Sequence, residues 1–240
     1  MQENSRLCVK TFSICSEIKY KEKKVASESI RYPEFYPGYA LQNDNSIINL
    51  AKKMSLFYKS AAERLSAYAH KTLAKKAYSK AKKSPDTKPF RVCMNCTVSY
   101  CSEHFVSVIT DVTSFDGQKT QSERISHNWS IEKACVLPAS YFLNTSHTSK
   151  KFIESYISDA VMRNMKNPFF GYYGDAQKSA VHHFSLSNFY FVPKGAAFYI
   201  NPGILCDAKY GPSVFVIPFT AADGIFKVTE KLSDNILPKP

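Results

Sequence analysis

The stretch "FYINPGILCDAKYGPSVFVIPF", Phe198–Phe219, decides the fold because two apolar runs enclose a loop of turn-forming residues. Pro202 has no backbone N–H to donate to a sheet, and it biases Asn201 toward an extended conformation. Gly211 can take a positive φ just before the second run. We therefore interpret the loop as a connection between two strands, in which these residues are structural and carry out no reaction.

Other strands are expected on the same grounds of alternation and turn residues. "HFSLSNFYFVP", "GAAFYINP" and "PSVFVIPF" predict three strands, with residues 193–195 as a tight turn. Residues 90–131 predict a three-stranded antiparallel meander, because Asp116–Gly117 is a hairpin signal. Residues 7–20 alternate between apolar and polar, and residues 25–33 are expected to pair with them.

Two helices are expected. Residues 43–83 form the clearer one, which Asp44, Asn45 or Ser46 can cap and which a proline-containing segment ends. Its apolar side chains recur at three- and four-residue steps and predict one buried stripe: Ile47, Leu50, Met54, Phe57, Ala61, Leu65 and Tyr68. Residues 146–165 predict a shorter helix, and residues 166–183 a long loop.

The expected order is therefore β-β-α-β-β-β-α-β-β-β. Strands and helices do not alternate one for one, which favours an α+β fold with antiparallel sheet and with one long and one shorter helix packed on a face. We expect an N-terminal region, 1–143, and a C-terminal region, 144–240, that together form one compact unit.

The chain carries a formal net charge of +12, which favours contact with an acidic partner. Part of the excess is concentrated near the end of the long helix, at Lys71, Lys75, Lys76, Lys80, Lys82 and Lys83. Cations at a helix C-terminus complement the helix dipole, so these lysines have a structural explanation. The alternative is a surface for nucleic acid or an anionic wall polymer, although no aromatic-interleaved RNA-binding signature accompanies the lysines.

Cysteine and histidine are the residues that could carry chemistry. Cys93, Cys96 and Cys101 are followed closely by His104, which suggests zinc ligands. In a strand, however, positions i and i+3 face opposite sides, so we expect ordinary thiols, no metal and no cofactor. Seven irregularly spaced cysteines fit a reducing compartment.

His182 and His183 could supply a general base or a metal ligand. Adjacent histidines entering a strand would point in opposite directions, and no G-x-S-x-G elbow provides a nucleophile. The aromatic residues of the loop before them are a candidate recognition surface: Phe169, Phe170, Tyr172 and Tyr173. Loop aromatics often anchor a protein interface, but they can also fold back on the core.

Residues 185–219 resemble the C-terminal part of a bacterial domain family. This family includes the extracellular part of the lysozyme-sensing anti-sigma factor RsiV and the accessory domain of the peptidoglycan deacetylase PdaC. The resemblance rests on an aromatic pair, a glycine turn, a strand ending in Asn-Pro, a Tyr-Gly loop and a strand ending in Ile-Pro. The matching residues are Phe189, Tyr190, Gly195, Phe198, Asn201, Pro202, Tyr210, Gly211, Ile217 and Pro218. Earlier segments are similar in order, except that "SFDGQKTQ" replaces the family's usual turn between meander strands.

The resemblance implies a non-catalytic binding or sensing module for a protein such as lysozyme or for cell-wall glycan. One alternative is a cytosolic basic protein that binds nucleic acid through its lysine-rich helix. A second is a hydrolase that uses His182 or His183. Neither a signal peptide nor a membrane span is visible, so a cytoplasmic location is expected.

Overall fold

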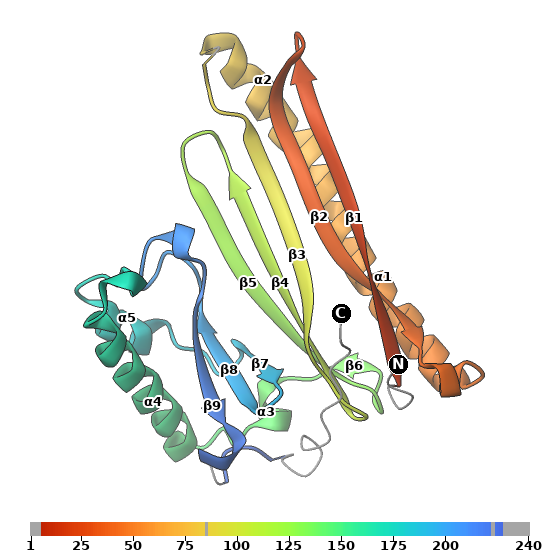
Figure 1. The fold of residues 1–240 in the computed structure, drawn as a ribbon, viewed down its shortest axis with the longest axis vertical. Coiled ribbons are helices and arrows are strands. Elements are labelled where there is room, and N and C mark those ends of the chain that lie inside the picture. The colour runs from red at the N-terminus through yellow and green to blue at the C-terminus, as the bar shows by residue number, and fades with distance from the viewer. Residues whose placement is uncertain (1–5, 85, 222–223, 228–240) are drawn as a thin grey trace. The chain divides into compact units, whose positions relative to one another are not determined.

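A computed structural model describes residues 6–84, 86–221 and 224–227, and Figure 1 shows its elements. The strands are β1 Leu7–Tyr20, β2 Lys23–Pro37, β3 Phe90–Cys101, β4 Phe105–Phe115, β5 Thr120–Ser130, β6 Cys135–Val136, β7 Phe189–Val192, β8 Gly195–Ile200 and β9 Ser213–Pro218. The helices are α1 Asn45–Tyr68, the π-helical segment η2 Ala69–Leu73, α2 Ala74–Lys83, α3 Ala139–Phe142, α4 His147–Met165 and α5 Ala176–His183. Short 3-10 turns are η1 Tyr39–Leu41, η3 Pro168–Phe170, η4 Ala208–Tyr210 and η5 Phe219–Ala221.

The fold is α+β, as the order of elements predicted. One sheet has the order β1-β2-β3-β4-β5-β6 and the other β7-β8-β9. Antiparallel pairing holds for β1 with β2 and throughout the smaller sheet. The expectation of purely antiparallel sheet is wrong at β2 and β3, which pair in parallel from Ala26↔Phe90 to Arg31↔Asn95. The long helix between these two strands is the crossover that a parallel pair needs.

By its internal contacts the chain forms two compact units. Unit 1 comprises residues 1–97 and 110–122, and unit 2 comprises residues 98–109 and 123–240. Strands β3, β4 and β5 therefore contribute residues to both units.

In unit 1 the continuous helix α1–η2–α2 packs on the β1–β2 hairpin (Figure 1). It begins at Asp44, whose Oδ1 accepts hydrogen bonds from the backbone N–H groups of Ser46 and Ile47. The predicted stripe is right as far as Met54. Beyond it, the buried positions lie one residue later than predicted. Its buried residues are Ile47, Leu50, Ala51, Met54, Tyr58 and Ala62, whereas Phe57 and Tyr68 are exposed.

The π-helical segment η2 interrupts the long helix at Ala69–Leu73. The N–H of Ala74 bonds to the carbonyl of Ala69, five residues back, so this turn contains one more residue than an α-helical turn. The extra residue keeps small side chains on the buried face in α2, where Ala74 and Ala77 are buried. Together with Val25, Phe90 and other apolar residues they form the core beneath this part of the helix.

In unit 2 the core is aromatic and centres on Phe142, whose ring makes edge-to-face contacts with Phe105, Phe189 and Phe191. Helix α4 buries Ile153, Ile157 and Val161 in the same core. Gly195 begins β8 at a point where a Cβ atom would lie 2.3 Å from the carbonyl oxygen of Ile217 on β9. This close approach, and not backbone flexibility, explains the glycine of the Pro-Lys-Gly turn.

Two expectations for residues 166–188 are wrong. The expected long loop, residues 166–183, contains η3 and helix α5. The first strand of the C-terminal set begins at Phe189 and not at His183, because α5 extends through both histidines and a turn follows it. Within the described ranges, no helix is both long and apolar enough to cross a membrane.

Candidate functional site

The aromatic residues that follow α4 are held in a short, well-connected loop in unit 2. The side chain of Asn167 accepts a hydrogen bond of 3.0 Å from the N–H of Phe169 and so caps the 3-10 turn. Gly171 ends that turn with φ +58°, and its N–H bonds to the carbonyl of Pro168. The left-handed backbone conformation at this position favours glycine. It sets the direction in which the chain leaves the turn.

The four predicted recognition residues divide into three that are exposed and one that anchors the loop. Phe169 is 84% exposed, Tyr173 45% and Phe170 37%. Tyr172 is half-buried and packs against the aromatic core of unit 2. The ring of Phe170 lies 6.5 Å from that of Phe169 and 5.6 Å from that of Tyr172, so the exposed rings continue outward from the anchored one. Three of the four side chains are therefore accessible, and the fourth folds back on the core.

The loop is fixed to the segment that precedes β9. Tyr172 forms an isolated antiparallel bridge with Cys206, and the N–H of Tyr173 donates a 2.8 Å hydrogen bond to the carbonyl of Leu205. Tyr210, which is 53% exposed, lies against the backbone of Gly171, where a Cβ atom would be 2.9 Å from its ring. We call Phe169, Phe170, Tyr173 and Tyr210 together the aromatic surface. Sequence reasoning gave Tyr210 only a structural role, because nothing in the sequence links it to a loop forty residues earlier.

The other residues of the Asn-Pro segment lie where the chain leaves β8. The side-chain oxygen of Asn201 accepts a 2.8 Å hydrogen bond from the N–H of Arg124 in β5. Gly203 and Gly211 have φ values of +82° and +78°. Pro202 lies between Asn201 and Gly203. These residues therefore shape the backbone between β8 and β9.

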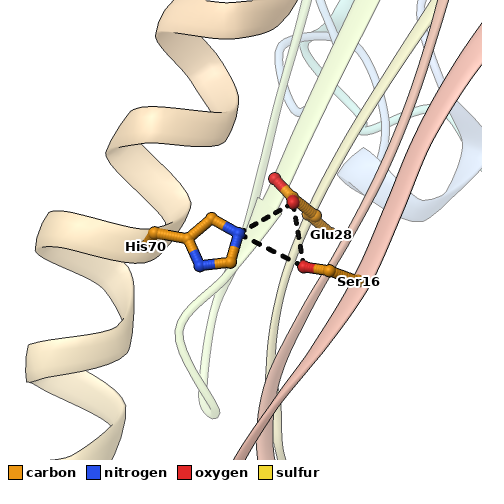
Figure 2. Close-up of polar contacts among 3 residues, drawn as sticks. All are labelled: Ser16, Glu28 and His70. Atoms are coloured by element: carbon orange, nitrogen blue, oxygen red, sulfur yellow. Dashed lines mark hydrogen bonds and ion pairs between the residues drawn. The ribbon is translucent and has the colours of Figure 1, made fainter.

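A second polar feature, which sequence reasoning missed, lies between the long helix and the hairpin of unit 1 (Figure 2). Glu28 on β2 is almost completely buried, and its Oε1 lies 2.9 Å from Nε2 of His70 and 2.8 Å from Oγ of Ser16. His70 belongs to the π-helical segment, and Ser16 to β1. The other carboxylate oxygen of Glu28 is buried and has no hydrogen-bond partner among the described residues.

This arrangement is not a catalytic triad. Both the hydroxyl of Ser16 and the carboxylate of Glu28 approach the same nitrogen of His70, at 3.3 and 2.9 Å. In a triad the acid binds one ring nitrogen and the nucleophile the other. The geometry instead connects three elements of unit 1 through one buried carboxylate. A buried carboxylate is costly unless it is hydrogen-bonded, and the contacts with Ser16 and His70 offset part of that cost.

The cysteine and histidine candidates for metal binding or catalysis lie in ordinary structural environments. Burial raises the pKa of Cys93 and of Cys96, and the Sγ of Cys96 lies 3.3 Å from the hydroxyl of Thr110. Neutral thiols are poor nucleophiles and poor ligands. Cys101 is buried at the end of β3, and His104 follows in the turn before β4. Within the described ranges, no three His, Cys, Asp or Glu side chains are grouped as metal ligands would be.

His182 and His183 are both exposed at the end of α5, with their ring centroids 4.9 Å apart. The expectation that they point to opposite sides of a strand is wrong, because they occupy successive positions of a helix.

No family model matches the sequence, and no curated protein matches it. The fold is nevertheless similar to solved structures of bacterial DUF3298 proteins. One, a family member from Bacteroides fragilis, is 11% identical with a TM-score of 0.71, over 96% of this chain and 99% of that chain. Another, from Pseudomonas aeruginosa, is 13% identical with a TM-score of 0.57, over 95% of this chain and 97% of that chain. At these identities the likeness shows the fold.

Proposed function

We propose that this chain is a non-catalytic binding module of the RsiV and PdaC accessory type, which holds a protein partner through the aromatic surface. The observation that carries the proposal is the exposure of Phe169, Phe170, Tyr173 and Tyr210 on a loop fixed by backbone hydrogen bonds. Aromatic anchors of this kind dominate the energy of protein interfaces. A loop that is already ordered loses little conformational entropy when a partner binds.

The shape of the surface suits a protein partner. The rings of Phe169 and Phe170 are perpendicular, with an interplanar angle of 90°. Phe169 is also 84% exposed, so its ring can enter a pocket on a protein partner. Two of the four side chains are phenylalanines, which supply no acid, base or nucleophile, and on this ground we assign the surface to binding. A lysozyme is the partner that the family resemblance suggests.

The test measures binding of immobilised full-length protein to lysozymes of several classes and to soluble peptidoglycan fragments. We expect a lysozyme to bind and the F169A/Y173A double variant to bind it at least about thirtyfold more weakly. Y39A is the matched control, because Tyr39 is 88% exposed but belongs to unit 1. Equal affinity of wild type and F169A/Y173A would refute the role of this surface. Binding of glycan without lysozyme would replace the proposed protein partner by a wall polymer.

We also propose that the chain works in a reducing compartment such as the cytoplasm. Cys8 and Cys15 are exposed free thiols on β1. Exposed thiols of this kind are readily oxidised outside the cell. Labelling of free thiols in protein taken directly from its cells tests this proposal. Cysteines that are oxidised and do not react with the label would contradict it. A cytoplasmic location would rule out an extracellular lysozyme and make the partner of the aromatic surface a protein of that compartment.

A further inference from the structure

A lysine-lined hollow of about 640 Å³ lies in unit 1, beside the end of the long helix. Lys75, Lys76, Lys80 and Lys83 of α2 line it on one side. Lys119, from the turn between β4 and β5, lines it from a different part of the chain. The hollow thus collects positive charge from two segments that are more than thirty residues apart.

The lining contains one carboxylate, Asp116, against five lysines, and its charge acts on Lys80. Asp116 uses its Oδ1 to accept hydrogen bonds from the N–H groups of Gln118 and Lys119, at 3.0 and 2.8 Å. These bonds hold the tight turn and keep the pKa of Asp116 low. Lys80 donates to the backbone carbonyl of Asp116, at 3.3 Å, and not to its carboxylate. In the part of the chain that the structure describes, none of the five lysines pairs with an acidic side chain.

The helix dipole explains only part of this cluster. Its influence is confined to the last turn of a helix, which here contains Lys80, Lys82 and Lys83. Lys75 and Lys76 lie near the start of α2, and Lys119 is not on the helix. Lys82 is in the last turn but does not line the hollow, and its ammonium lies 6.0 Å from the ring of Tyr20. A separate cause is needed for the convergence of the other lysines.

The wall between the lysines is aromatic. Tyr68 is 41% exposed, Phe115 is half-buried, and Phe90 is buried with the ammonium of Lys80 5.6 Å from its ring. A hollow of this volume is typical of small-ligand sites and is too small for a long stretch of polymer. Lysine is a common phosphate ligand, and several lysines suit several phosphate groups on one molecule.

We propose that this hollow binds an oligophosphate ligand, either free or as part of a nucleotide whose base contacts the aromatic wall. The phosphates lie among Lys75, Lys76, Lys80, Lys83 and Lys119, and they replace the missing acidic partners of these side chains. The site belongs to unit 1 and does not depend on the aromatic surface of unit 2.

Calorimetric titration with tripolyphosphate tests the proposal on the full chain. We expect binding that weakens with added salt, and a loss of about tenfold or more in the K76A/K119A double variant. The matched control is K71A/K82A, which removes the same amount of charge from positions of the long helix outside the lining. All four lysines are exposed, so both double variants are expected to keep the melting temperature of the wild type.

Titration with adenosine triphosphate distinguishes the two sources of phosphate. Tighter binding than that of tripolyphosphate supports a nucleotide, and equal binding supports free oligophosphate. An equal effect of K76A/K119A and K71A/K82A would overturn the site. So would binding of a single-stranded oligonucleotide without any binding of tripolyphosphate, because the ligand would then be a polymer that covers a wider surface.

Discussion

His127 lies in β5 with most of its imidazole buried, and this burial lowers its pKa below the ordinary value of 6.5. The unfolded chain therefore binds a proton at a higher pH than the folded chain does. Stability contributed by neutral His127 is complete above about pH 6.5 and is lost as the pH falls below that value. Urea unfolding between pH 5 and 8 should show a decline on the acid side, of at most about 1.4 kcal/mol per pH unit from this one group.

The H127Q variant isolates this contribution, because glutamine does not titrate. We expect its free energy of unfolding to fall less steeply than that of the wild type between pH 6.5 and 5. Parallel curves for the two proteins would show that other groups cause the acid decline.

Residue types predicted the local features well and the distant contacts poorly. Asp44 as a helix cap and Asp116–Gly117 as a hairpin turn follow from neighbours in the sequence. The contact of Glu28 with His70 joins positions 42 residues apart, and neither residue belongs to a recognisable motif. The sequence showed only that Glu28 stands in a strand of alternating residues. It did not indicate that His70 would be its partner.

At the level of elements, long periodic segments were predictable and short ones were not. The long helix and the C-terminal strands follow from 3.6- and 2-residue periods. Helix α5 has only 8 residues, which is too short for a clear period. The parallel pairing of β2 and β3 depends on where the long helix returns the chain. The sequences of the two strands do not indicate that position.

The π-helical segment is the element that brings His70 to the hairpin, so removing this imidazole tests the contact. In H70A, the buried carboxylate of Glu28 loses the ring nitrogen that lies 2.9 Å from its Oε1. We expect a loss of about 1–3 kcal/mol in the free energy of unfolding. Circular dichroism during urea unfolding measures this loss. K71A, on the next residue of the same segment, is the control and should change little.

Adding E28Q to H70A refines this test. Glutamine carries no charge, so the double variant should recover part of the loss caused by H70A. Further destabilisation instead would show that the carboxylate is held mainly by contacts other than His70, such as the hydroxyl of Ser16.

For the whole molecule, the question is whether the two units unfold together. Strands β3, β4 and β5 each supply residues to both units, so neither unit keeps all its strands when the other unfolds. Trp129 is the chain's single tryptophan, and it is buried in unit 2. Its fluorescence therefore reports on unit 2, while H70A acts in unit 1.

We expect H70A to shift the urea midpoint of Trp129 fluorescence as much as that of helical circular dichroism. Coincident transitions are the signature of a single cooperative unit, and the shared strands are the physical reason to expect them here. K71A again serves as the control, with both midpoints at the wild-type value. If Trp129 kept its wild-type midpoint while the helical signal moved, the units would unfold independently, and the stability of the aromatic surface would not depend on unit 1.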